Sequence, residues 1–174
     1  MLRRSIIAAL VTYAFVHASA QSPSTPSGLG IGAIKAYEGT WKFSSVSLDT
    51  PYSKAGKDEK VLRNDCWRSA SYYVCNQFVD GVSQLLIVYT YDQQRNVYTS
   101  YLVPLDGTAA SSGTLEINGD TWTYPWEVTE NGSKVYVRVV NVFKSPESIL
   151  YRREFSRDKV NWTVMATGNE VRTK

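Results

Sequence analysis

Histidine is almost absent from this sequence: the one copy in 174 residues is His17. It lies in an amino-terminal segment with the pattern of a signal peptide, in which two arginines precede an apolar run from Ile6 to Val16 and an Ala-Ser-Ala triplet at residues 18–20. We expect cleavage after Ala20. The mature chain then has no histidine, which excludes Ser-His-Asp and Cys-His catalysis, haem ligation through a proximal histidine and histidine-based zinc sites.

Long hydrophobic runs and an excess of charge are also missing. The run from Ile6 to Val16 is shorter than the roughly 20 helical residues that cross a bilayer, and no later stretch is apolar enough to do so. No cysteine lies near the cleavage point, which argues against a lipid anchor. Cleavage lowers the 19 basic residues to 17 against 16 acidic ones, so nucleic acid is not an expected partner. We expect a soluble exported protein, periplasmic or extracellular.

The residues that remain after cleavage predict one all-β domain. Residues 21–28 read QSPSTPSG, a flexible linker, and the domain spans 29–174. Apolar residues from Leu29 to Tyr37 fall near helical spacing and predict a short helix. Beyond it, turn residues separate short β-like runs, which favours a single closed antiparallel up-and-down barrel of about 8–10 strands. The predicted strands are 40–47, 60–68, 72–79, 84–91, 97–103, 114–117, 121–128, 134–143, 149–156 and 160–166, with 170–173 continuing the last.

Two cysteines, Cys66 and Cys75, stand on two of these runs. If the turn centres on Ala70-Ser71, Ser69 and Tyr72 close the hairpin and the cysteines lie opposite each other at a non-hydrogen-bonded position, where side chains approach most closely. We predict a disulfide, formed in an oxidising compartment. Two unpaired buried thiols are the alternative.

The run YEGTWKF at residues 37–43 contains a Gly-x-Trp that, after a short apolar helix, resembles the opening of the calycin superfamily of lipocalins and fatty-acid-binding proteins. The resemblance implies that Trp41 closes one barrel end and that a late basic residue, Arg172, packs over it. With the cysteine hairpin, the run FSRDKVNWT at residues 155–163 looks like a group of uncharacterised bacterial exported lipocalin-like proteins. The Arg-x-Tyr pair of fatty-acid-binding proteins is missing from the tail, so fatty-acid binding does not carry over.

Aromatic residues are the first candidates for a ligand site, because aromatic walls with a few polar tips are typical of small-molecule pockets. The alternative is that they pack the core and the barrel ends. The aromatic candidates are Trp41, Trp67, Tyr89, Tyr101 and Trp126.

Two arginines, Arg138 and Arg153, complete the candidate site. Arg152 and Arg153 are consecutive in a strand and must face opposite ways, and Arg153 shares its face with apolar residues. We expect Arg153 to face inward and to need either a ligand anion or an internal acid, for which the sequence offers Asp65, Glu127 and Glu154. Arg138 lies among apolar residues of another strand, so it too could face inward and need a partner. An outward, solvated position is the alternative.

These features favour an exported, non-enzymatic binding protein that holds a small apolar or amphipathic ligand in its barrel, a reading that rests on fold analogy. One alternative is a filled barrel that serves as an envelope structural or interaction module. The other is a hydrolase that uses a pair of carboxylates. No cofactor, metal site, catalytic residue or protein partner is predicted.

Overall fold

The computed structural model describes residues 30–173. The predicted signal peptide and the whole of the predicted linker lie outside these residues. The described chain forms ten β-strands and one short 3-10 helix, η1. No helix within residues 30–173 is long and apolar enough to cross a membrane.

The strands match the expected pattern of short runs between turns. Their bounds are η1 (Ile31–Tyr37), β1 (Gly39–Ser47), β2 (Gly56–Ser69), β3 (Tyr72–Val79), β4 (Val82–Asp92), β5 (Val97–Pro104), β6 (Ser111–Asn118), β7 (Thr121–Glu130), β8 (Ser133–Ser145), β9 (Ser148–Ser156) and β10 (Thr163–Thr173).

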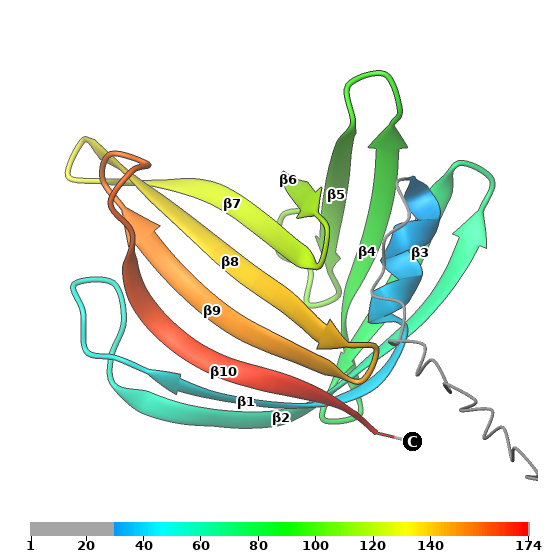
Figure 1. Cartoon of the computed structure of the whole chain (residues 1–174), viewed down its shortest axis with the longest axis horizontal. Helices are drawn as coiled ribbons and strands as arrows, with labels where there is room; N and C mark the ends of the chain where they lie inside the picture. Colours follow the sequence, from blue (N-terminus) through cyan, green and yellow to red (C-terminus); the bar gives the residue numbers. More distant parts are fainter. Residues whose placement is uncertain (1–29, 174) are drawn as a thin grey trace, which may run out of the picture.

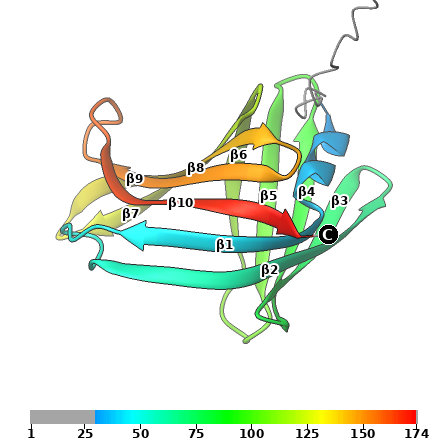
Figure 2. The ribbon, with the colours of Figure 1, turned by 60° about the horizontal axis from the view of Figure 1, so that its bottom comes forward.

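Each strand pairs antiparallel with its neighbours in sequence, and β1 also pairs with β10, which closes the sheet into a barrel. Figures 1 and 2 show the result: β7–β10, β1 and β2 form a long curved wall, and β3–β5 stand steeply across it. The prediction of a closed antiparallel barrel is confirmed.

The last strand starts later than predicted. Residues 160–162 belong to a tight loop that Asp158 organises: its carboxylate accepts hydrogen bonds from the backbone N–H of Val160 at 2.9 Å and of Asn161 at 2.7 Å. These bonds hold the pKa of Asp158 well below its usual range. Because this loop uses the backbone N–H groups itself, β10 begins only at Thr163.

One end of the barrel is closed as the calycin resemblance implies. Trp41 is fully buried, and the Arg172 guanidinium lies 4.1 Å from the centroid of its ring. Arg172 also donates to the carbonyls of Ala36 at 2.9 Å and of Glu38, which ties β10 to η1. A Cβ at Gly39 would lie 2.7 Å from the same guanidinium, so the glycine of Gly-x-Trp makes room for Arg172.

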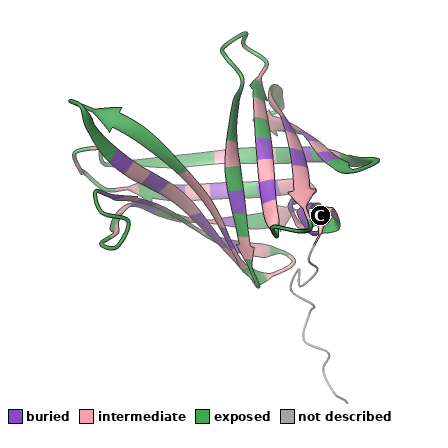
Figure 3. Ribbon diagram, turned by 90° about the horizontal axis from the view of Figure 1, so that it is seen from above, coloured by how far each residue is buried: buried purple, intermediate pink, exposed green. Residues whose placement is uncertain are grey.

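The predicted disulfide between Cys66 and Cys75 is present, with the two Cα atoms 4.0 Å apart. Its register is also as predicted, since Ser69 pairs with Tyr72 and Cys66 with Cys75. Ala70 adopts a positive φ of 50° in the turn. Figure 3 shows that buried positions alternate along the strands, as expected where one face points into the barrel.

Candidate functional site

The interior of the barrel contains a cavity of about 350 Å³. Its wall draws on η1 and on eight of the ten strands, so it is the lumen of the barrel rather than a surface groove. The lining residues are Tyr37, Leu62, Asn64, Cys75, Gln77, Ile87, Tyr89, Leu102, Tyr124, Val139, Asn141, Tyr151 and Glu170. This mixture of an apolar wall with a few polar groups is typical of small-molecule sites.

Glu170 is the one carboxylic acid in this wall. Its position on β10 is fixed by cross-strand pairing with Phe43 of β1 and Ile149 of β9, both of which are buried. The residue is 6% exposed, and among the described residues its side chain has no ion pair or hydrogen bond. Burial without a partner raises its pKa from 4.5 to about 7.

Tyrosine hydroxyls and amides form the polar part of the same wall. The side-chain amide of Asn141 donates to the hydroxyl of Tyr37. Burial raises the pKa of Tyr37 and Tyr124 well above 10 and that of Tyr89 to about 12, so these hydroxyls stay neutral. The side-chain oxygen of Asn141 is buried and has no hydrogen-bond partner in the described chain.

Arg153 faces inward, as predicted, but lies outside the cavity wall. It pairs across the sheet with Val139 and Ala166 and is half-buried, and its Nε is buried with no hydrogen-bond partner within residues 30–173. Tyr151 is the inward-facing residue before it on β9, and both Arg153 and Glu170 act on the Tyr151 hydroxyl electrostatically. The cavity is therefore flanked by an unpaired acid and an inward arginine.

The three acids predicted as partners of Arg153 do not contact it. Asp65 is exposed and pairs with Arg63 at 3.1 Å. Glu127 pairs with Lys134 and Lys159. Glu154 is buried, but it points away from the lumen. The prediction of an internal partner for Arg153 is wrong on all three, because each acid stands at a strand position whose side chain faces outward.

Of the five predicted aromatic residues, Tyr89 lines the cavity and Trp41 seals the barrel end. Trp67 and Tyr101 are 49% and 46% exposed, and the expectation that they line the cavity is corrected. Trp67 follows the inward Cys66, and Tyr101 precedes the inward Leu102, so strand alternation turns both outward. Their ligand-binding role has no support from their positions.

Trp126 and Arg138 border a second hollow, an outer groove also of about 350 Å³. It opens where β6 and β7 separate, because their pairing covers only Glu116–Asn118 and Thr121–Thr123. The groove is lined by Thr114, Glu116, Thr123, Pro125, Trp126, Glu127, Tyr136, Val137, Arg138, Lys159 and Trp162.

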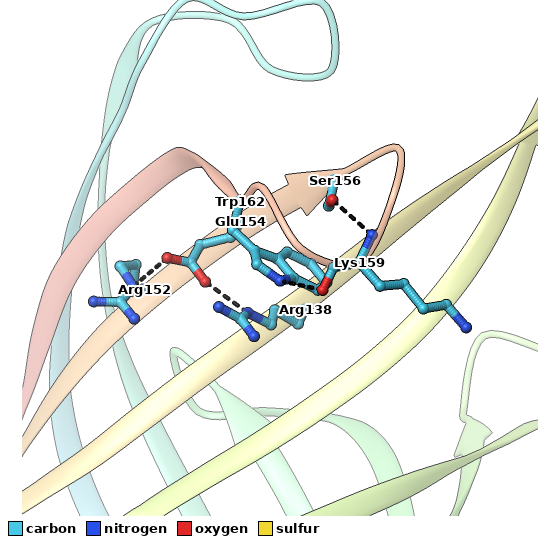
Figure 4. A network of polar contacts seen from close by, with 6 residues as sticks. All are labelled: Arg138, Arg152, Glu154, Ser156, Lys159 and Trp162. Carbon is cyan, nitrogen blue, oxygen red and sulfur yellow. Dashed lines mark hydrogen bonds and ion pairs between the residues drawn. The ribbon is translucent and has the colours of Figure 1, made fainter.

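Arg138 faces outward, the alternative that the sequence left open, but it is not simply solvated. Its Nε lies 2.6 Å from Glu154, and Trp162 covers its guanidinium at 3.8 Å from the ring centroid. Arg152 contacts the other carboxylate oxygen of Glu154, also at 2.6 Å. Figure 4 shows this network on the outer face of β8 and β9.

Glu170 is not among the residues predicted from the sequence, although the sequence contains a signal for it. Arg172 was expected to pack over the inward Trp41, and residues two apart in a strand share a face. Alternation therefore places Glu170 inside the barrel as well. The described residues hold no cluster of three metal-ligating side chains, and the cavity wall offers one acid and one disulfide-bonded cysteine.

Comparison with known proteins leaves the family open. No model of a known protein family matches the chain, and no curated protein has significant similarity to it. Among solved structures, Rv2717c from M. tuberculosis is similar with 10% identity and a TM-score of 0.47, over 83% of this chain and 97% of that one. EF1p2_mFAP2b, solved bound to DFHBI, matches with 14% identity and a TM-score of 0.37, over 84% and 100%. At these scores neither likeness says what this chain binds.

Proposed function

We propose that the chain is an exported, non-enzymatic, calycin-like binding protein that holds a small amphipathic molecule inside its barrel. The observation that carries this proposal is the lumen of about 350 Å³, walled by aliphatic and tyrosine side chains. A barrel that served only as a scaffold would fill its interior with side chains. The signal-peptide pattern and the disulfide support export to an oxidising compartment.

The first test is native mass spectrometry of the full-length gene product purified from its own cells, before and after denaturation. We expect an additional stoichiometric mass that denaturation releases. The same experiment establishes the mature amino terminus, for which the proposal requires Gln21.

A cavity-filling variant links the bound mass to the lumen. Leu102→Trp places a large side chain into the cavity, whereas Val103→Trp, one residue along the same strand, points to the exterior. The first variant should lose the bound mass and calorimetric binding of 1-naphthalenemethanol, and the second should keep both. A bare wild-type mass together with no binding of this alcohol would contradict the proposal.

The interaction-module alternative has one observation in its favour. Trp67, Val74, Val88 and Tyr101 are cross-strand neighbours on the outer face of β2–β5, and the two aromatic residues at its ends are about half exposed. A photo-crosslinker at Tyr101 in the exported protein tests it. Capture of one defined partner there, with none from a crosslinker at the equally outward Thr99, would favour this alternative.

The hydrolase alternative requires two acids that face each other. The lumen offers only Glu170. Glu116 and Glu127 share the outer groove, but Lys134 and Lys159 lower the pKa of Glu127. A general acid needs the opposite shift, so catalysis is not part of the proposal.

A further inference from the structure

We infer that the ligand of the barrel lumen is a small organic cation with an apolar body, whose protonated amine is held by Glu170. This deepens the proposed function and rests on it. The class of ligand follows from three features of the wall: an acid without a partner, acceptors that receive no hydrogen bond, and four tyrosines.

The first feature is the isolation of the acid. Buried carboxylates in proteins are normally paired with a cation or several donors, because burying an uncompensated charge is costly. Glu170 is 6% exposed, lines an open space and has no such partner among the described residues. A ligand cation in that space would supply the missing counter-charge.

The second feature is the balance of donors and acceptors. The lining amides already donate within the protein: Asn64 to the carbonyl of Tyr37 at 3.1 Å, Gln77 to Asn64 at 3.1 Å, and Asn141 to the Tyr37 hydroxyl. Two acceptors of the wall have no donor among the described residues: the carboxylate of Glu170 and the side-chain oxygen of Asn141. Unused acceptors call for a ligand that donates, and an ammonium group is donor-only.

The third feature is the aromatic character of the wall. Tyr37, Tyr89, Tyr124 and Tyr151 all line the cavity. Tyrosine faces attract cations, and more strongly where water is excluded. Their raised pKa values keep them neutral, so they add no second negative charge.

The cations around Glu170 are occupied elsewhere or lie apart. Arg172, two residues along β10, is committed to Trp41 and to the backbone carbonyls of Ala36, Glu38 and Pro146. Lys60 of β2 forms an ion pair with Asp58 at 2.6 Å and lies over Phe43. Arg153 of β9 makes no ion pair with Glu170 and is not in the cavity wall, so the described chain does not neutralise the acid itself.

Three naphthalene probes of nearly equal shape test the inference by calorimetry on the intact mature protein: 1-naphthylmethylamine, 1-naphthalenemethanol and 1-naphthoate. At pH 8 the amine should bind at least about tenfold more tightly than the alcohol, since a charge-assisted hydrogen bond is roughly twice as strong as a neutral one. The preference should fall between pH 8 and 6 as Glu170 takes up a proton while the amine stays charged.

Glu170→Gln keeps the shape of the side chain and removes its charge, so it should abolish the preference for the amine and leave binding of the alcohol within about twofold. Glu59→Gln is the matched control, because it removes the same charge from an exposed residue on β2. It should keep the preference, which excludes an effect of net charge.

The failures are distinct. If the alcohol binds and the amine binds no better, or if the preference survives in Glu170→Gln, the inference is wrong and the proposed function stands. If 1-naphthoate binds best and Arg153→Met removes that binding, the lumen selects anions through Arg153 and the inference is overturned. If no probe binds, the inference fails, and the proposed function fails with it when the wild-type protein also carries no bound mass.

Discussion

Two glutamates on adjacent strands are equally buried and yet stand in opposite surroundings. Glu154 on β9 is 5% exposed and Glu170 on β10 is 6% exposed. Glu154 faces outward, where Arg138 and Arg152 each contact it at 2.6 Å and Trp162 covers Arg138. Glu170 faces the lumen, where no described residue pairs with it.

The difference shows that burial alone does not mark a functional acid. At Glu154 the protein provides two cations and a tryptophan that covers one of them. The charge of this carboxylate is therefore compensated within the protein, and its role is structural. At Glu170 the protein provides a cavity and leaves the charge uncompensated, which costs stability. A buried polar group without a partner needs an explanation, and perturbed acids in cavities are candidates for function.

The largest expected effect is on the pH dependence of stability. The pKa of Glu170 is about 7 in the folded protein against an ordinary 4.5, so its stabilising contribution is fully present below pH 4.5 and is lost as pH rises through 7. Glu170→Gln lacks this dependence. Its free energy of unfolding relative to wild type should therefore rise by about 3 kcal/mol between pH 4.5 and pH 8. Urea unfolding across that range measures it, and parallel pH profiles would contradict it.

The same substitution at the other glutamate should have the opposite sign. Glu154→Gln leaves two arginines facing a neutral amide, and removing one partner of a buried pair is destabilising. Because Arg138 and Arg152 are partly exposed, with side chains 28% and 46% accessible, solvent screens part of the loss. We expect about 2 kcal/mol at pH 8 by urea unfolding. A Glu154→Gln protein as stable as wild type would remove the contrast.

The smallest effect concerns the cover over the outer pair. Trp162→Ala removes the ring that lies 3.8 Å from the Arg138 guanidinium and exposes the pair to water, which should cost about 1 kcal/mol in the free energy of unfolding. Trp67→Ala is the control, because that exposed tryptophan makes no cation–π contact among the described residues. It should change stability by less than about 0.5 kcal/mol. If the two variants lost equal free energy of unfolding, Trp162 would not stabilise the protein by covering the Arg138–Glu154 pair.

Much of the fold was predictable because its signals are local. Alternating apolar residues and turn residues gave nine of the ten strands within a few residues, and the Ala70-Ser71 turn fixed the register that joins Cys66 to Cys75. The tenth strand was started too early, since the loop after Ser156 contains Val160 and Trp162 and resembles a strand in composition. Only the hydrogen bonds to Asp158 show that it is a loop.

The site was harder to predict because composition does not say which face of a strand lines a cavity. Trp67 and Tyr101 have the residue types of a ligand wall and lie outside it. Glu170 has the residue type of a solvated surface and lies inside. Because Cys66 faces inward and side chains alternate along a strand, the sequence contained a signal that Trp67 faces outward. No local pattern shows that the lumen is hollow, because its volume depends on side chains from eight strands.

The most direct test of an unpaired acid that awaits a ligand cation is a carbon-13 NMR titration of the Glu170 side-chain carboxyl, assigned with Glu170→Gln. We predict a pKa of about 7 in the free protein and a lower value when 1-naphthylmethylamine is bound, because a bound cation stabilises the carboxylate. A free-protein pKa near 4.5 would mean that Glu170 is solvated or paired. A pKa that the bound amine leaves unchanged would mean that the amine lies elsewhere.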